Sequence, residues 1–395
     1  MNNNPTYKPS PLGPIPNDWD VKRLEDVCQH FKSGFGITSE HIFESGDYPV
    51  YGGNGLRGYT SAFTHDGEYL LIGRQGALCG NIQRVSEKVY ISEHAIAVQT
   101  NNANDLDFLA YKLDFKNLNR LSESSAQPGL AVEKLQRLKI SLPPLPEQRA
   151  IAAVLSTWDN AIGKMQTLIA QKELRKKWLM QQLLTGKKRL PAFAKASAGK
   201  KGFGGEWMEM HLGDLFTERN ETNFFALQLL SIGQNGVYPQ DESIKKDTSN
   251  DDKSKYKRIC PGDIGYNTMR MWQGRSALSE LEGIVSPAYT VLTAKNNADS
   301  LFFSYLFKTP KMTNLFWRNS QGLVDDTLNC KFKDFSIIKV LLPHSKVEQT
   351  AIAKVLQAAD KEIELLKAKE EKLKEQKKGL MQVLLSGKKR LKIEN

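Results

Sequence analysis

The chain has 395 residues, of which 40% are hydrophobic and 25% charged, and it carries a net charge of +11. No apolar run approaches the roughly 18 residues that a membrane span needs, and the N-terminal segment lacks the basic and apolar regions of a secretion signal. Its four cysteines lie far apart, which argues against a disulfide scaffold and a cysteine-based metal site. We therefore expect a cytoplasmic protein with reduced thiols, no metal and no membrane association.

Most of the excess positive charge lies in two short segments. Residues 172–190 hold seven Lys or Arg and one Glu, and residues 369–392 hold nine Lys or Arg and three Glu. Each segment has a net charge of +6, so the rest of the chain sums to about −1. This placement favours a polyanionic partner, and the alternative is a solvated, lysine-rich helical face.

The first globular segment, residues 1–145, is rich in Gly, Tyr and Thr. Its short alternating runs, such as residues 68–72 and 95–98, predict strands separated by turns.

A long helix follows over residues 146–190. It begins at Pro146-Glu147, which supplies a rigid first turn and an acid near the positive helix end, and it stops at Gly186.

Residues 191–205 form a basic, low-complexity linker that leads into a second globular segment, residues 206–343. A second long helix occupies residues 344–395. It opens with Ser345-x-x-Glu348, a predicted capping box, and it stops at Gly387.

The two helices are copies of one another at a constant offset of 201 residues. Residues 150–152 match residues 351–353, and LLTGKKRL at 183–190 matches LLSGKKRL at 384–391. The two globular segments share only sparse landmarks, such as Trp19 and Trp207. A common scaffold that carries two different reading heads has this pattern.

Both helices carry an apolar stripe at heptad spacing, which needs a partner. The residues that we expect to pair the helices are Ile151, Leu155, Trp158, Ile162, Met165, Ile352, Leu356, Ile363, Leu366 and Leu373. We predict an intramolecular coiled coil, whereas the alternative is that each helix packs on its own globular segment. The charged residues at the middle and later seam positions, Lys172, Lys176, Glu370 and Lys377, weaken the seam or set its register.

The sequence resembles the specificity subunit of type I restriction-modification systems over nearly its whole length. The residues that carry the resemblance are Leu142 to Gln148 with Leu183 to Gly186, Leu342-Pro343 with Glu348-Gln349 and Leu384 to Gly387, and Tyr48 to Gly55 with Ile72 to Ala77. The doubled pattern is highly specific. Residues 344–347 depart from the family's pattern.

The resemblance implies an α+β fold, with two globular α/β target recognition domains built on twisted β-sheets. Two long helices would form an antiparallel coiled coil with pseudo-twofold symmetry, which matches the dyad of the DNA backbone. Each domain would read half of a split, asymmetric site in double-stranded DNA. Two methyltransferase subunits that bind S-adenosylmethionine would dock on this chain. Restriction subunits that hydrolyse ATP with Mg²⁺ would join them, and this chain would bind no cofactor.

The chain has no recognisable catalytic motif. Pro143-Pro144 lacks the Asn/Asp and Tyr of an amino-methyltransferase loop, and residues 186–188 lack the glycine and hydroxyl of a phosphate loop. The glycines of residues 31–36 have the wrong spacing for a cofactor loop. Glu93-His94 suggests acid–base chemistry, but a structural histidine is the simpler interpretation.

Base readout is expected from Arg, Asn and Gln side chains in glycine-rich loops, because they make bidentate contacts in the major groove. The DNA-binding candidates are Asn54, Arg57, Arg74 and Gln75 in the first segment, and Gln234, Asn235, Arg270, Trp272, Gln273 and Arg275 in the second. Each has a phosphate contact or a solvated turn as its alternative, and Asn54-Gly55 fits a simple turn.

Two other functional classes compete. A stand-alone DNA-binding regulator explains the charge but leaves two long basic helices unused. A structural coiled-coil scaffold does not explain two differing heads on one repeated frame. Gel filtration with a neighbouring methyltransferase separates the three hypotheses.

Overall fold

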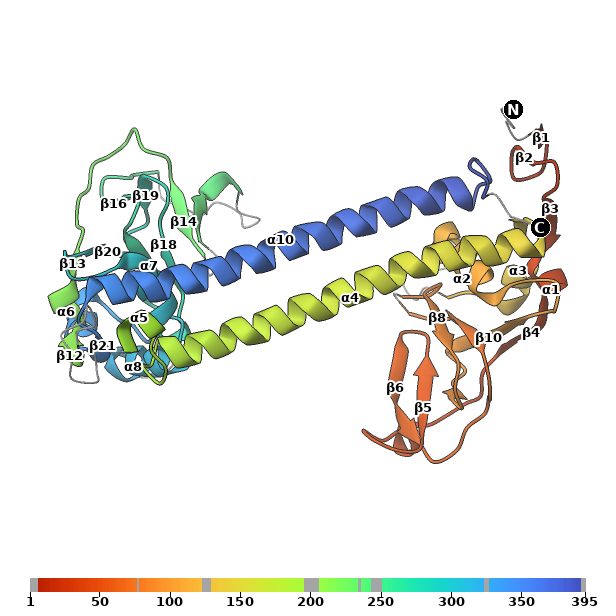
Figure 1. The fold of residues 1–395 in the computed structure, drawn as a ribbon, viewed down its shortest axis with the longest axis horizontal. Coiled ribbons are helices and arrows are strands. Elements are labelled where there is room, and N and C mark those ends of the chain that lie inside the picture. Colours follow the sequence, from red (N-terminus) through yellow and green to blue (C-terminus); the bar gives the residue numbers. More distant parts are fainter. Residues whose placement is uncertain are drawn as a thin grey trace. The chain divides into compact units, whose positions relative to one another are not determined.

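The computed structural model describes residues 6–76, 78–122, 129–194, 206–233, 236–242, 251–322 and 327–391. The chain forms two compact units, namely unit 1 (residues 1–166 and 368–395) and unit 2 (residues 167–367). The helices α4 (Leu145–Leu183) and α10 (Lys346–Leu384) each continue from one unit into the other (Figure 1). Each unit therefore holds a globular part with a portion of α4 and a portion of α10. Within the described ranges, no helix combines the length and the apolar character that crossing a membrane requires.

Unit 1 is built on an antiparallel sheet with the strand order β4-β10-β7-β8. Its strands are β4 (Cys28–Ser33), β7 (Tyr69–Gly73), β8 (Ile82–Val85) and β10 (Ala95–Thr100). The central strand β10 alternates between two cores. Ile96 and Val98 enter the main core, whereas Ala95 and Ala97 enter a smaller one. This alternation follows from the two-residue period of a strand that is covered on both faces.

The smaller core of unit 1 lies beneath a second sheet, in which β5 pairs with β6 and with β9. The strands of the smaller sheets are β1 (Tyr7–Lys8), β2 (Ile15–Pro16), β3 (Asp20–Arg23), β5 (Tyr48–Gly52), β6 (Gly55–Thr60), β9 (Tyr90–Ile91) and β11 (Lys139–Leu142). The helices are α1 (Leu24–Val27), η1 (Ser39–His41), α2 (Leu106–Lys116), η2 (Leu118–Leu121) and α3 (Val132–Gln136).

Unit 2 repeats this plan, since its main sheet has the order β13-β20-β17-β18 and β12 pairs with β21 as β3 pairs with β11. Its strands are β12 (Trp207–His211), β13 (Phe216–Glu218), β14 (Leu230–Ile232), β15 (Val237–Pro239), β16 (Lys257–Ile259), β17 (Ile264–Asn267), β18 (Ser276–Leu278), β19 (Gly283–Val285), β20 (Tyr289–Ala294) and β21 (Lys339–Pro343). Its helices are α5 (Pro191–Ala194), α6 (Leu212–Leu215), η4 (Gln240–Glu242), η5 (Met271–Gln273), α7 (Ser300–Leu306), α8 (Pro310–Asn319) and α9 (Phe332–Ser336). The predicted α+β fold with two related globular parts is confirmed.

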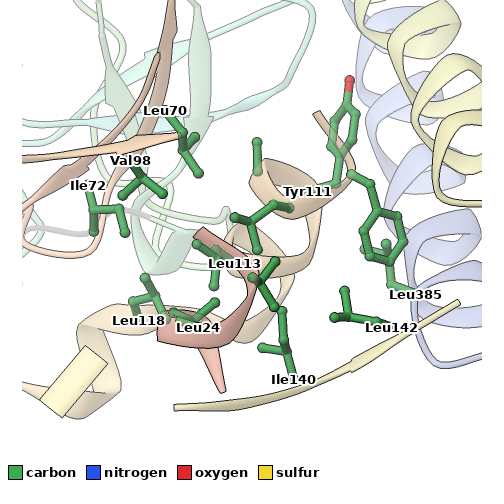
Figure 2. Close-up of a cluster of buried hydrophobic side chains, with 14 of the residues drawn as sticks. Leu24, Leu70, Ile72, Val98, Tyr111, Leu113, Leu118, Ile140, Leu142 and Leu385 are labelled. Atoms are coloured by element: carbon green, nitrogen blue, oxygen red, sulfur yellow. The ribbon is translucent and has the colours of Figure 1, made fainter. Parts of the chain in front are cut away.

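The main core of each unit joins three parts of the chain. In unit 1, Ile151 and Leu155 from the start of α4 and Leu384 from the end of α10 lie in one cluster with the sheet residues. Figure 2 shows Leu385 beside Leu142 of β11 in this cluster. In unit 2 the roles of the helices are exchanged, because the core contains the start of α10 and the end of α4. The start of each helix thus packs on its own globular part, and the end of the other helix completes that core.

The helix ends agree with the sequence in part. Gly186 and Gly387 follow the last turns with φ of 71° and 74°, a left-handed conformation that glycine adopts without strain. The predicted capping box at Ser345 is different in the structure, because the Glu348 carboxylate accepts hydrogen bonds from Arg189. Of the predicted linker, residues 191–194 form α5 with Phe193 buried, and the rest lies outside the described residues.

Candidate nucleic-acid interface

Several loops of unit 1 meet at one edge of its sheets. A Cβ atom at Gly53, in the β5–β6 turn, would lie 2.8 Å from the His94 carbonyl oxygen and 3.3 Å from that of Gln75. The Arg74 amide donates to the His94 carbonyl over 2.8 Å, and the Glu93 amide donates to the Phe35 carbonyl over 3.0 Å. The β5–β6 turn, the loop after β7, the loop before β10 and the segment after β4 therefore form one loop cluster.

Three of the four sequence candidates of the first segment belong to this loop cluster, and the fourth, Arg57, lies on the adjacent strand β6. Asn54 is exposed in the tight turn between β5 and β6, as its alternative interpretation expected, and Arg57 is exposed on β6. Arg74 is half-buried, and its guanidinium donates to the Ser33 hydroxyl over 3.2 Å. Gln75 is exposed in the next position. Their contact with DNA remains a prediction.

Two further polar residues of this cluster were not among the DNA-binding candidates. His94 Nδ1 lies 2.8 Å from Gln75 Oε1, and His94 Nε2 lies 3.3 Å from a Glu93 carboxylate oxygen. The sequence separates Gln75 and His94 by 19 residues. The signal that joins them is the pairing of β7 with β10, which places Gly73 opposite Ala95.

The candidates of the second segment lie between β17 and β18. Trp272 and Gln273 belong to η5, with Arg270 before it and Arg275 after it. Gln273 and Arg275 are exposed, and Arg270 and Trp272 are half-buried. The second segment's other candidates, Gln234 and Asn235, lie outside the described residues.

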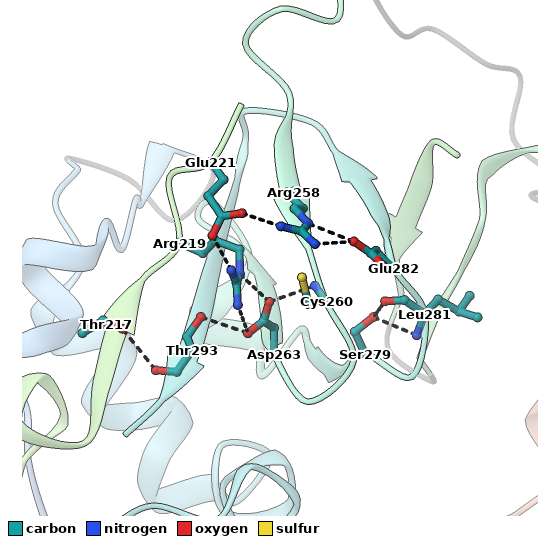
Figure 3. A network of polar contacts seen from close by, with 10 residues as sticks. All are labelled: Thr217, Arg219, Glu221, Arg258, Cys260, Asp263, Ser279, Leu281, Glu282 and Thr293. Atoms are coloured by element: carbon teal, nitrogen blue, oxygen red, sulfur yellow. Dashed lines mark hydrogen bonds and ion pairs between the residues drawn. The ribbon is translucent and has the colours of Figure 1, made fainter. Parts of the chain in front are cut away.

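Unit 2 also contains a charged network beside its sheets, which Figure 3 shows. Arg219 donates to the buried Asp263 over 2.8 Å and also contacts Glu221. Arg258 donates to Glu221 over 2.9 Å and to Glu282 over 2.5 Å. The hydrogen bonds that Arg219 donates to Asp263 raise the pKa of Arg219. Both guanidinium groups are held by carboxylates of the same unit, so this network supports the sheet and offers less positive charge to a ligand.

The two long helices are antiparallel within each unit. In unit 1, Asp159 of α4 pairs with Lys377 of α10 at 2.6 Å, and Gln166 donates to Glu370 over 2.9 Å. Residue numbers rise along one helix as they fall along the other, as antiparallel packing requires. Lys377 is one of the charged seam positions, and its pairing agrees with a role in setting the register.

Unit 2 contains the equivalent contacts, displaced by 201 residues. Asp360 of α10 pairs with Lys176 of α4, as Asp159 pairs with Lys377 in unit 1. Tyr305 donates to Asp360 over 2.6 Å, and Tyr111 donates to Asp159 over 2.6 Å. Burial, together with these hydrogen bonds, raises the pKa of both tyrosines.

The expected helix-pairing residues divide by burial. The buried ones are Ile151, Leu155, Ile162, Ile352, Leu356 and Ile363, and the half-buried ones are Trp158, Met165, Leu366 and Leu373. Ile151, Leu155, Ile352 and Leu356 belong to the globular cores, where they meet the end of the other helix. The remaining six therefore test the seam itself more directly.

In each unit, an arginine that follows the end of one long helix binds a buried glutamate in the first turn of the other. In unit 1, Arg390 donates to Glu147 over 2.6 and 2.7 Å, and the Trp19 indole donates to the same carboxylate over 3.1 Å. In unit 2, Arg189 donates to Glu348 over 2.9 and 2.5 Å, and the Trp207 indole donates over 3.4 Å. We call these contacts the arginine clasps. They join the repeated GKKRL motif at the end of one helix to the first turn of the other.

The described ranges contain no group of three His, Cys, Asp or Glu side chains that could hold a metal ion. His94 is engaged by Gln75 and Glu93, and burial raises the pKa of the Cys28 and Cys330 thiols to about 12. The polar groups of the loop clusters are suited to hydrogen bonding with a ligand.

Comparison with known proteins identifies relatives over most of the chain. The family model described as type I restriction modification DNA specificity domain matches residues 16–173 and 204–375. The specificity subunit of the EcoprrI type I restriction enzyme of Escherichia coli is 46% identical over 143 residues, which are 35% of this chain and 35% of that relative. The MjaVIII specificity subunit of Methanocaldococcus jannaschii is 26% identical over 412 residues, which cover 96% of this chain and 94% of that relative.

Solved structures show the same fold. The S subunit of a type I restriction-modification system from M. genitalium has a TM-score of 0.62 at 17% identity and covers 100% of this chain and 98% of its own. A chain from a study of complex assembly and conformational transition of the type I system has a TM-score of 0.55 at 16% identity, and covers 94% of this chain and 99% of its own.

Proposed function

This chain belongs to the type I restriction-modification DNA specificity family, and we propose that units 1 and 2 each read one half of a bipartite, asymmetric DNA site. The observation that carries the proposal is the doubled architecture with unlike loops. Equivalent loops follow equivalent strands, yet one holds Arg74 and Gln75 and the other holds Arg270, Gln273 and Arg275. Arginine and glutamine are the side chains best suited to base edges.

The helices have the second role in this proposal. They set the spacing between the two half-sites and dock two methyltransferase subunits, which bind S-adenosylmethionine. Restriction subunits that use ATP and Mg²⁺ then join the complex. The basic ends of both helices, residues 172–190 and 369–392, support an additional phosphate contact. The chain itself is non-catalytic.

Reconstitution tests the function as a whole. The chain mixed with its methyltransferase subunits is expected to elute as one complex and to methylate a split sequence with a constant gap. The chain alone, with S-adenosylmethionine, ATP and Mg²⁺, is expected to leave DNA unmethylated and uncut. Long-read methylation mapping identifies the two half-sites. Methylation by the isolated chain, or methylation by the complex at a single uninterrupted motif, would contradict the proposal.

Arginine substitutions assign each unit to its half-site. Arg57→Ala and Arg74→Ala are expected to weaken recognition of one half-site, and Arg270→Ala and Arg275→Ala that of the other. Loss of a base contact costs about 1–3 kcal/mol and relaxes one position, whereas loss of a phosphate contact lowers affinity for all sequences and reduces the salt slope by about 1.

Binding of the reconstituted complex to duplexes with single base changes measures these effects. Arg137→Ala, at an exposed arginine at the end of α3, is the matched control and is expected to keep both preferences. Unchanged binding in all four loop variants would show that other loops read the DNA.

A further inference from the structure

Glu93, His94 and Gln75 form a chain of polar contacts in the unit 1 loop cluster. The imidazole lies between the other two side chains, with Nδ1 2.8 Å from Gln75 Oε1 and Nε2 3.3 Å from Glu93 Oε1. The second Glu93 oxygen is buried and has no hydrogen-bond partner within the described part of the chain. His94 is therefore the donor that the described residues place beside this carboxylate.

Proton positions follow from the chemistry of these groups. An ionised carboxylate only accepts, so the Nε2 atom that faces it carries a proton. The Gln75 oxygen also only accepts, so the Nδ1 atom that faces it carries a proton as well. Both conditions are met when His94 donates from both ring nitrogens. In this arrangement the amide oxygen of Gln75 accepts from His94, and within the described residues its NH₂ group has no hydrogen-bond partner.

We propose that His94 and Glu93 are positioning residues that determine specificity by presenting Gln75 to DNA as a hydrogen-bond donor. This rests on the proposed function of unit 1 as a reader of one half-site. A glutamine binds adenine through its oxygen and its NH₂ group together, with both groups facing the base. When the Gln75 oxygen is held against His94, one of its lone pairs is engaged and the oxygen is turned from the base, so the side chain presents its NH₂ group, which donates for example to guanine O6 or N7 or to thymine O4. This Glu93–His94–Gln75 arrangement, which we call the relay, thus selects against adenine at the base pair that Gln75 faces.

The equivalent loops of unit 2 lack this relay. In unit 1 the Arg74 amide donates to the His94 carbonyl, and in unit 2 the Thr268 amide donates to the Ala288 carbonyl over 3.2 Å. The two contacts are equivalent, because a later loop donates to the Arg74 carbonyl from Leu130 in unit 1 and to the Thr268 carbonyl from Cys330 in unit 2. By this correspondence, Met269, Pro287 and Ala288 stand where Gln75, Glu93 and His94 stand in unit 1. The same backbone frame therefore carries a polar relay in one unit and apolar side chains in the other, as a variable specificity element would.

The test uses the full chain in complex with its methyltransferase subunits. Competition binding is measured on duplexes that carry each single base change in either half-site. His94→Ala is expected to release the Gln75 oxygen, so that adenine becomes accepted at one position of the first half-site and discrimination there falls about tenfold. Glu93→Ala is expected to relax the same position to a smaller extent, and Gln75→Ala to remove its preference. His211→Ala, at an exposed histidine of unit 2, is the matched control.

The preference for the second half-site serves as an internal measure of folding in every variant. If Gln75→Ala changes a base preference while His94→Ala and Glu93→Ala leave it intact, the relay is wrong and the proposed function stands. The same holds if Gln75→Ala changes no preference while Arg57→Ala or Arg74→Ala does. If the wild-type complex shows no bipartite preference, the proposed function itself fails and the relay fails with it. If the His94→Ala complex loses all binding, the Glu93→Ala complex decides the question. A Glu93→Ala complex that keeps the wild-type base preference at this position overturns the relay.

Discussion

The Arg390→Ala variant is expected to lower the free energy of unfolding of unit 1 by about 3–5 kcal/mol, because it breaks a buried ion pair and leaves one charge behind. Glu147 is only 1% exposed and accepts two hydrogen bonds from the Arg390 guanidinium, which also donates to the exposed carboxylate of Asp18. After the substitution, the Trp19 indole is the remaining described donor to this carboxylate. An isolated buried carboxylate is far more costly than a missing surface pair.

Unit 2 offers the same experiment with the helices exchanged. Arg189→Ala leaves Glu348, which is 0% exposed, with Trp207 as its remaining described donor, so the same loss is expected there. Lys389→Ala removes an exposed cation beside Arg390 and is the matched control, with an expected effect within about 0.5 kcal/mol.

Hydrogen exchange followed by mass spectrometry measures each unit separately in one molecule. Arg390→Ala is expected to accelerate exchange in unit 1 and Arg189→Ala in unit 2. An Arg390→Ala protein that exchanges like the Lys389→Ala control would show that the clasp contributes little.

The arginine clasps illustrate which parts of the fold the sequence predicted and which it did not. The repeat at an offset of 201 residues predicted both helices, their glycine ends and their pairing. It also showed Glu147 and Glu348 as equivalent residues, but it assigned Glu348 to a local capping box. A carboxylate three residues after a serine fits the capping-box pattern whether it caps the helix or accepts hydrogen bonds from a distant arginine. The partner of Glu348 in the structure is Arg189, which lies 159 residues away in the sequence, so a local sequence pattern does not reveal the pair.

The helix stripe shows a similar boundary between prediction and structure. Periodicity identified Leu155 and Leu356 as apolar positions, and both are 0% exposed. Periodicity alone does not distinguish a helix seam from the core of a globular domain, because both bury the same face. Both residues lie in globular cores. An aspartate at either site is therefore expected to unfold its unit, whereas Ile162→Asp and Ile363→Asp test the seam.

For the candidate interface, residue types and loop chemistry led to Arg74, Gln75 and the Arg270 to Arg275 loop. They did not lead to His94 as a partner of Gln75. That contact depends on the register of β7 against β10, which places Gly73 opposite Ala95. This register brings the loop that follows β7 next to the loop that precedes β10. A one-residue change of register would move every side chain to the other face, and register is not readable from composition.

A buried lysine makes the stability of unit 1 depend on pH. Lys112 of α2 is 4% exposed, and its ammonium donates to the Ser141 hydroxyl over 2.8 Å and to the Leu385 carbonyl at the end of α10 over 2.5 Å. Burial lowers its pKa from 10.5 to about 7, with a smaller contribution from Lys116. The lysine thus holds the end of α10 in the unit 1 core while its own charge is disfavoured there.

Between pH 7 and pH 10.5 the unfolded chain binds more protons at this site than the folded unit. The free energy of unfolding of unit 1 is therefore expected to rise with pH across this window, by about 1.4 kcal/mol per pH unit for this one group. The penalty is fully present below pH 7 and is relieved as the pH approaches 10.5. Over the whole window the effect is on the order of 5 kcal/mol.

The chain offers its own control for this effect. Tyr111 corresponds to Tyr305, since each donates to the equivalent aspartate, so Leu306 stands in unit 2 where Lys112 stands in unit 1. Lys112→Leu is expected to remove the pH dependence. Urea unfolding at pH 7, 8 and 9, read by a brief thiol-labelling pulse, reports unit 1 through Cys79 and unit 2 through Cys330, which are 1% and 0% exposed. If the stability of unit 1 relative to unit 2 follows the same pH course in the wild type and in Lys112→Leu, the ammonium is not disfavoured in the core, and its two hydrogen bonds to Ser141 and Leu385 offset the whole cost of burial.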